Sequence, residues 1–184
     1  MFGEYFESKN LSSLGDICKF IDYRGKTPPK VDKGVMLLTA KNVRDGFLSF
    51  EPREYMDADK YKQWMTRGYP QCGDILFTTE APLGNVCRIP QIDEPFAVGQ
   101  RIVTIQPSKK ILNYDYVAYV LQSDYFRSEV EKQSTGSTAK GIKSRLLMKL
   151  GIPVPPLCTQ EQFSGLIRQS DKSKLLLKKI ISRR

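Results

Sequence analysis

The stretch KLGIPVPPLCTQEQ, residues 149–162, divides this chain into two parts. Its apolar residues 152–154 predict a short buried strand. Pro155 and Pro156 end that strand, because proline has no amide hydrogen to donate to a sheet. A compact domain therefore ends at this point in the sequence.

A long helix is predicted immediately after the two prolines. Thr159 precedes Gln162 by three residues, which is the spacing of a capping box at a helix N-terminus. The rest of the chain contains no proline and, after Gly165, no glycine. We therefore expect a domain over residues 1–158 and a protruding helix over residues 159–184.

The predicted helix carries a seam whose positions are spaced alternately by three and four residues, as in a coiled coil. The seam and the residues that widen it are Phe163, Leu166, Ile167, Ser170, Ser173, Leu177, Ile180 and Ile181. A lone helix of this length is marginal in water, so the seam needs a partner. It could fold back on its own domain, or form an antiparallel coiled coil with a second copy or another subunit. We favour the coiled coil, because the domain is large enough to bury a core without the helix.

The charge of the chain favours a polyanionic partner. Lys and Arg number 29 against 20 Asp and Glu, which gives a net charge of +9. Residues 159–184 contribute +5 of this excess and residues 1–158 contribute +4. A solvated basic surface would give a similar balance, but charge concentrated on one helix points toward nucleic acid.

The cysteines and the absence of histidine narrow the possible chemistry. Cys18, Cys72, Cys87 and Cys158 show no C-x-x-C spacing, which argues against a zinc site and favours isolated thiols in a reducing compartment. The sequence has no histidine, so Ser-His-Asp and Cys-His catalysis are excluded. An acidic N-terminus and the lack of an apolar stretch of about 18 residues predict a cytoplasmic protein.

Motifs of nucleotide hydrolysis and methyl transfer are also missing. The loop over residues 134–144 resembles a phosphate-binding loop, but an isoleucine separates its second glycine from the lysine, and the loop follows a predicted helix. The sequence has no Gly-x-Gly loop for S-adenosylmethionine. A hydrolase that uses Cys72 or Cys87 would lack a base of suitable pKa. We therefore expect no catalytic residue, no metal and no cofactor.

Predicted strands and helices alternate irregularly, which indicates an α+β domain. Residues 75–79 and 86–89 predict a hairpin, and residues 101–106 predict a strand buried on both faces. Asn113 is a suitable N-cap for a helix over residues 114–132. We expect a β-rich domain with a mixed or antiparallel sheet and flanking helices, followed by the long coiled-coil helix.

Basic and amide side chains in loops beside the predicted strands are the candidate DNA contacts. Arginine makes paired hydrogen bonds to guanine and glutamine to adenine, whereas lysine binds phosphates. Each cluster alone also fits an ordinary solvated surface. The candidates are Arg24, Lys26, Lys41, Asn42, Arg44, Gln100, Arg101, Lys140, Lys143 and Arg145.

Several segments, in a specific order, resemble one target recognition domain of the specificity subunit of type I DNA restriction–modification enzymes. The resemblance covers about residues 12–184 and depends on order and spacing, because each piece alone is common. The pieces are LGDI at 14–17, RGKTPP at 24–29, GDILFT at 73–78, PLG at 82–84, AVGQR at 97–101, the helix over 114–132, TG at 135–136, IPVPP at 152–156 and QEQ at 160–162.

The resemblance implies a non-catalytic subunit that reads one half of a bipartite site in double-stranded DNA from the major groove. It implies long helices that join two recognition domains and act as a ruler between the half-sites. It also implies DNA methyltransferase (modification) subunits that methylate adenine, and a nuclease-motor subunit for restriction. The alternative is an assembly module that docks a methyltransferase and has only non-specific affinity for DNA.

One departure from the family concerns length. The usual subunit carries two recognition domains, whereas this chain carries one. We expect a natural half-subunit, a product of gene rearrangement or a trimmed piece. A half-subunit would form a homodimer through its terminal helices and read a palindromic site, because the symmetry of a protein is mirrored in its DNA site.

Overall fold

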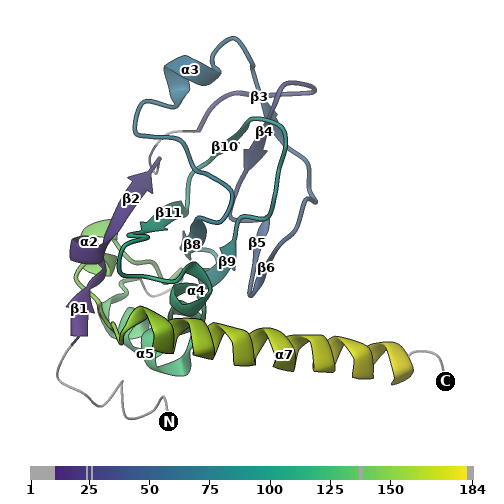
Figure 1. The fold of residues 1–184 in the computed structure, drawn as a ribbon. Helices are drawn as coiled ribbons and strands as arrows, with labels where there is room; N and C mark the ends of the chain where they lie inside the picture. Colours follow the sequence, from purple (N-terminus) through teal and green to yellow (C-terminus); the bar gives the residue numbers. More distant parts are fainter. Residues whose placement is uncertain (1–10, 24, 26, 137–138, 182–184) are drawn as a thin grey trace.

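The computed structural model of the chain describes residues 11–23, 25, 27–136 and 139–181, and of residues 171–181 it describes the backbone alone. The helices are α2 (Leu14–Ile17), α3 (Tyr61–Trp64), α4 (Tyr114–Gln122), α5 (Asp124–Gln133), α6 (Ser144–Leu147) and α7 (Leu157–Ile181). The strands are β1 (Leu11–Ser13), β2 (Cys18–Asp22), β3 (Lys30–Val31), β4 (Val35–Leu38), β5 (Val43–Arg44), β6 (Phe47–Leu48), β7 (Tyr55–Met56), β8 (Ile75–Thr79), β9 (Leu83–Arg88), β10 (Phe96–Val98), β11 (Ile102–Pro107) and β12 (Gly151–Pro153). Figure 1 shows a β-rich body with α7 running along its base and beyond its edge.

The central sheet has the strand order β2-β11-β8-β9, and all neighbouring strands are antiparallel. Every residue of β8 is buried, and β11 is buried apart from Gln106. These two strands confirm the predicted apolar runs. The predicted hairpin is confirmed as well, although β9 begins at Leu83, earlier than expected, because Leu83 already pairs with Thr79.

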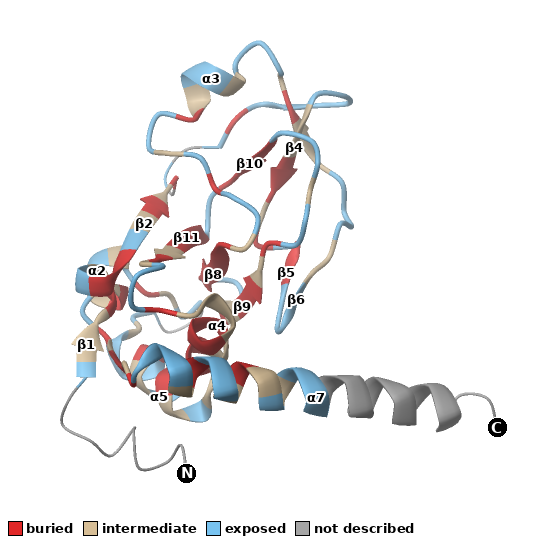
Figure 2. Ribbon diagram, viewed as in Figure 1, coloured by how far each residue is buried: buried red, intermediate tan, exposed pale blue. Residues whose placement is uncertain are grey.

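A layer covers each face of the central sheet, which explains why its middle strands are apolar throughout. On one face Phe77 packs against α4 and α5, with its ring edge-on to Phe126 at 6.4 Å between centroids. On the other face Leu76 and Ile102 pack against a second sheet of order β10-β4-β7-β3. Figure 2 shows the buried residues concentrated in these strands. Because β10 and β4 are parallel, the fold is a mixed α+β arrangement, as expected.

The helix predicted over residues 114–132 is two helices, α4 and α5. Asn113 caps α4 as expected, since its Oδ1 accepts from the Tyr116 amide at 3.1 Å. Ser123 breaks the run, because its extended backbone ends α4 and its hydroxyl accepts from the Phe126 amide at 3.2 Å. Ser123 is therefore an N-cap that interrupts an otherwise continuous apolar pattern.

α7 begins at Leu157, two residues before the predicted start at Thr159. The amides of Thr159 and Gln160 donate to the carbonyl oxygen of Pro156 at 2.9 and 3.1 Å. The capping-box prediction was wrong, because Pro156 already supplies the first helical acceptor and Thr159 lies inside the first turn. Among the described residues, no helix is both long and apolar enough to cross a membrane.

The first turns of α7 pack on the domain. The Phe163 ring lies edge-on to Tyr116 and Tyr119, with centroids 5.7 and 6.0 Å apart, and Ser164 is buried. Phe163 therefore packs within the domain, contrary to its predicted place on a free seam. The side chain of Leu166 is uncovered, with 60% of its surface exposed. Of the other seam residues, Ile167 is half-buried and Ser170 is exposed, and the side chains of Ser173, Leu177, Ile180 and Ile181 lie outside the described part of the chain.

Candidate nucleic-acid interface

The antiparallel order of the central sheet brings distant segments to one of its ends. β2 ends at Asp22, which pairs with Val103 near the start of β11. β8 ends at Thr79, whose amide donates to the Arg101 carbonyl at 2.9 Å. The segment after β2, the turn after β8 and the loop before β11 therefore all leave the sheet at the same end, which we call the loop end.

The second sheet and the loop after α5 reach the same place. The Gly99 amide donates to the Leu38 carbonyl at 2.7 Å, so the turn after β4 lies beside the loop before β11. The Ile142 amide donates to the Thr79 carbonyl at 3.0 Å, and Gly141 pairs with Glu80. The loop end consists of residues 22–23, 39–42, 80–82, 99–101 and 139–143.

Several predicted DNA contacts meet at the loop end, although they come from segments far apart in the sequence. Those exposed there are Lys41, Gln100, Arg101, Lys140 and Lys143. This juxtaposition follows from strand order and register, and each of the clusters borders the end of a buried strand. It gives one end of the sheet an array of donors suited to phosphates and base edges.

The other predicted contacts are placed differently. Arg145 is exposed on α6, directly after the loop end. Arg44 is exposed on the β5–β6 hairpin, which joins the edge of β9 through a 3.0 Å hydrogen bond from Asn85 Nδ2 to the Val43 carbonyl. The predicted contacts Arg24 and Lys26 lie outside the described residues.

Arg101 has an unusual backbone. Its φ is +66°, in the left-handed region that a residue with a side chain rarely adopts. Ala81, also at the loop end, has a φ of +45°, and these two are the non-glycine residues with positive φ in the described part of the chain. Such strain is maintained only by the surrounding structure and concentrates at functional sites. The side chain of Arg101 is half-exposed, and its Nε lies 3.3 Å from Glu80 Oε1.

Lys41 is also held by a carboxylate. Glu54 Oε1 lies 2.8 Å from Lys30 Nζ and 3.3 Å from Lys41 Nζ. Burial acts to raise the pKa of Glu54, but hydrogen bonds and charge from the two lysines lower that pKa overall. Glu54 therefore remains ionised at neutral pH, so a phosphate that binds Lys41 must compete with this ion pair.

Asn42 is an internal residue, which corrects its prediction as a DNA contact. Its side chain is only 2% exposed. Oδ1 accepts from the Thr39 amide at 2.9 Å, and Nδ2 donates to the carbonyls of Ser49 and Pro52, both at 3.0 Å. With its amide committed to these bonds, Asn42 shapes the loop that presents Lys41.

We expect Asn42→Ala to lower the free energy of unfolding by on the order of 1 to 2 kcal/mol, because the buried Asn42 side chain makes three hydrogen bonds to the backbone that alanine cannot replace. Chemical denaturation of the full chain measures this change. The matched control is Lys41→Ala, an exposed neighbour whose replacement should change stability by less than about 0.5 kcal/mol. Equal stability of the two variants would contradict the internal role of Asn42.

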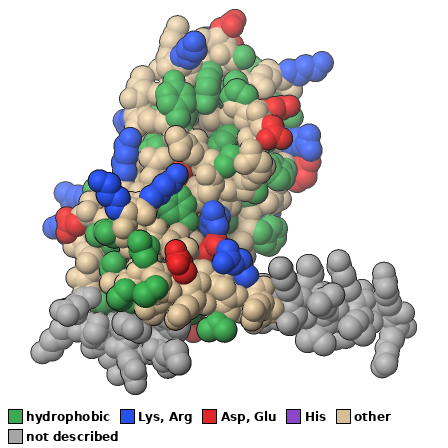
Figure 3. Space-filling model, in the orientation of Figure 1, with side chains coloured by type: hydrophobic (Ala, Val, Ile, Leu, Met, Phe, Trp, Pro, Cys, Tyr) green, Lys and Arg blue, Asp and Glu red, His purple; other side chains and the backbone are tan. Residues whose placement is uncertain are grey.

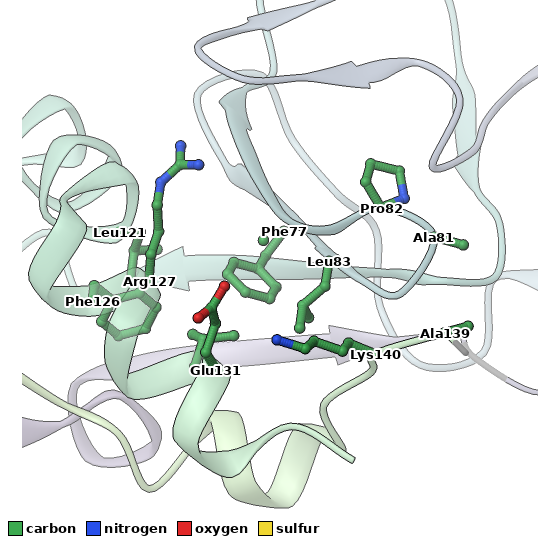
Figure 4. A pocket seen from close by; sticks show the side chains of 12 residues that line it. Phe77, Ala81, Pro82, Leu83, Leu121, Phe126, Arg127, Glu131, Ala139 and Lys140 are labelled. Carbon is green, nitrogen blue, oxygen red and sulfur yellow. The ribbon is translucent and has the colours of Figure 1, made fainter. Parts of the chain in front are cut away.

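A pocket of about 460 Å³ opens beside the loop end. Its floor is apolar and comes from the β8–β9 hairpin and from α4 and α5, including Phe77, Leu83 and Phe126. Figure 4 shows Lys140 and Glu131 extending over this floor from opposite sides. The pocket thus separates the loop that carries Lys140 from the helix that carries Glu131.

Arg127 is a basic residue near this site that the sequence did not single out. It lines the pocket from α5, and its Nη2 lies 2.7 Å from Asp45 Oδ2 on the hairpin between β5 and β6. The sequence signal for the position of Arg127 on its helix is the Ser123 N-cap, because that cap sets where α5 begins. On the face of the molecule shown in Figure 3, basic and acidic side chains are interspersed.

Comparisons with known proteins show which proteins the chain is similar to. The family described as "Type I restriction modification DNA specificity domain" matches residues 7–183. The type I restriction enzyme MjaVIII specificity subunit of Methanocaldococcus jannaschii is 28% identical over 149 residues, which are 76% of this chain and 34% of that protein. The chain therefore spans about a third of the length of this relative.

Solved structures share the fold. The HsdS subunit from Thermoanaerobacter tengcongensis superposes with a TM-score of 0.65 at 21% identity, over 93% of this chain and 39% of that one. The S subunit of a type I restriction–modification system from M. genitalium gives 0.60 at 16% identity, over 89% and 39%. A structure reported for complex assembly and conformational transition of the type I R-M system gives 0.68 at 22% identity, over 93% and 40%.

Proposed function

This chain belongs to the type I restriction modification DNA specificity domain family, and we propose that it reads one half of a bipartite site in double-stranded DNA. The observation that carries the proposal is the convergence of Gln100, Arg101 and the three lysines at the loop end. A strained, half-exposed arginine held beside a carboxylate is suited to exchange that partner for a guanine edge. The lysines around it are suited to phosphates.

We further propose that the chain is not itself an enzyme. In this proposal methyltransferase subunits bring the chemistry and methylate adenine, and a nuclease-motor subunit joins them for restriction. The chain supplies the sequence preference. Its lack of histidine and of the usual nucleotide-binding loops supports this division of labour.

The part of the chain that leads out of the domain suggests how two recognition domains could be joined. The chain covers 34% to 40% of the length of the relatives described above, and α7 is the element that extends beyond the domain (Figure 1). We propose that α7 pairs with its counterpart in a coiled coil. The uncovered side chain of Leu166 supports a partner beyond the first turns of the helix.

The direct test is selection of bound duplexes from a random DNA pool by the full chain with its methyltransferase partner, followed by sequencing. Enrichment of a short sequence would support half-site reading. Binding that is salt-sensitive but shows no sequence preference would favour the alternative, an assembly module with non-specific affinity.

Lys140→Ala should weaken binding to all sequences about equally and reduce the slope of log K against log salt by about 1, as expected for loss of one phosphate contact. Fluorescence anisotropy over a salt series measures both effects. Lys149→Ala is the matched control, because Lys149 is exposed beside β12, at the opposite end of the central sheet. An identical salt slope for the two variants would remove Lys140 from the interface.

A further inference from the structure

The first turns of α7, which we call its root, contain a fully buried glutamine. Gln160 has 0% of its surface exposed. Its Oε1 accepts from the Asn113 amide at 2.9 Å, and its Nε2 donates to the carbonyls of Ile111 and Pro155 at 2.9 and 2.7 Å. One side chain thus joins α7 to the backbone at the start of α4 and to the segment that leads into α7 itself.

Ser164, one turn further along α7, extends this network. It is 1% exposed, and its Oγ lies 2.9 Å from Asn113 Oδ1 and 2.8 Å from the Gln160 carbonyl. Asn113 Oδ1 also caps α4 through the Tyr116 amide. Asn113 therefore both caps α4 and hydrogen-bonds to α7.

A charged contact follows on the next turn. The Asp115 carboxylate pairs with Arg88 on β9 and, at 3.3 Å, with Arg168 on α7. Figure 3 shows basic and acidic side chains side by side where the helix meets the body. Because Arg168 is largely exposed, this pair adds little stability, but it lies on the side of α7 that faces α4.

We propose that Gln160, Ser164 and Asn113 form a positioning lock that fixes the direction in which α7 leaves the domain, and thereby the spacing between half-sites. The proposal rests on the half-site function above. Apolar packing of Phe163 is non-directional and would allow α7 to swivel. Hydrogen bonds depend on direction, and a rotation of α7 would move the buried Gln160 side chain away from the Asn113 backbone amide and the Ile111 carbonyl.

The length of α7 amplifies small changes at its root. With 25 residues, the helix is about 37 Å long. A swivel of about 10° would move its far end by roughly 6 Å, close to two base-pair steps of about 3.4 Å. If the start of α7 were free to swivel, a pair of domains would therefore accept a wider range of spacings between half-sites.

The first arm of the test measures the direction of α7 by electron–electron distance spectroscopy on the full chain. Labels go on Gln63→Cys and Gln169→Cys, both exposed positions off the predicted seam, after Cys72→Ser and Cys158→Ser remove the exposed thiols. The other two thiols stay unlabelled, because burial raises the pKa of Cys18 and Cys87 to about 12. Dilution with unlabelled protein suppresses distances between copies.

Gln160→Met keeps the side-chain volume and removes the hydrogen bonds, and Gln162→Met is the matched control at an exposed position of the same helix. A single narrow distance in the parent and in the control, with a broadened or shifted one in Gln160→Met, is the expected result. An unchanged narrow distance in Gln160→Met would overturn the lock. Should Gln160→Met unfold, Ser164→Ala removes only one hydroxyl and decides the same question.

The second arm measures spacer preference with the methyltransferase-bound assembly and duplexes whose half-sites are separated by varied spacers. For Gln160→Met we expect the half-site sequence to be retained, while preference for the best spacer over its neighbours falls by roughly tenfold. If Gln160 only stabilised the fold, Gln160→Met would weaken binding to duplexes of every spacer length equally. That result would contradict the inference. If the parent shows no half-site preference, the proposed function fails, while the distance measurement still decides the lock.

Discussion

Replacing Arg101 with alanine is expected to remove the preference for one base pair of the half-site. The preferences at the other base pairs of the half-site should stay the same. A guanidinium that makes paired hydrogen bonds to a guanine contributes on the order of 1 to 3 kcal/mol of discrimination, which is roughly 5- to 150-fold in relative binding. The half-exposed side chain and its replaceable Glu80 partner make Arg101 the strongest candidate for such a contact. Competition binding with duplexes that differ at single positions measures the effect.

Arg101→Lys is the matched control for this prediction. Lysine keeps the positive charge and the backbone strain but lacks the planar fork, so it should retain phosphate attraction and lose the base preference. Stability should change little in either variant, because alanine and lysine meet the same left-handed backbone as arginine at a φ of +66°. A uniform loss of affinity across all duplexes would make Arg101 a phosphate anchor instead.

The strands were predictable because burial on both faces leaves a local mark. β8 and β11 are apolar runs, and no partner needs to be known to recognise them. The interruption at Ser123 was harder, since the apolar period continues across it from α4 into α5. Only the Ser-Asp pair, a good cap followed by an acidic first-turn residue, signals the break.

Residue type predicted which side chains are candidates for the site, but it did not predict which of them are exposed. Lys41 and Asn42 are neighbours in one polar cluster, yet the first is exposed and the second is buried. The difference comes from Ser49 and Pro52, which lie well beyond the cluster in the sequence. The start of α7 shows the same limit of residue type as a guide. The capping-box spacing pointed to Gln162, whereas the buried residue is Gln160. Gln160 lies on the same helix face as Phe163 and Ser164.

Leu177→Glu combined with Ile180→Glu is expected to abolish assembly through α7 and leave the domain folded. The two positions lie on the predicted seam, and the helical backbone extends to Ile181. An unpaired carboxylate buried in a coiled-coil seam costs several kcal/mol, more than one such interface can absorb. We expect the domain to be spared because Gln160, Phe163 and Ser164, near the start of α7, already attach the helix to it.

Light scattering after size-exclusion chromatography, with and without the methyltransferase partner, measures the mass of the assembly, and thermal unfolding checks the domain. Lys172→Glu combined with Lys179→Glu is the control, because these lysines lie off the seam and their replacement alters the net charge more than the seam variant does. Loss of assembly in the seam variant alone would locate the partner on the seam. If the seam variant still assembles, α7 is not the element that joins the subunits. If neither variant assembles, the overall charge of α7, rather than packing along the seam, holds the subunits together.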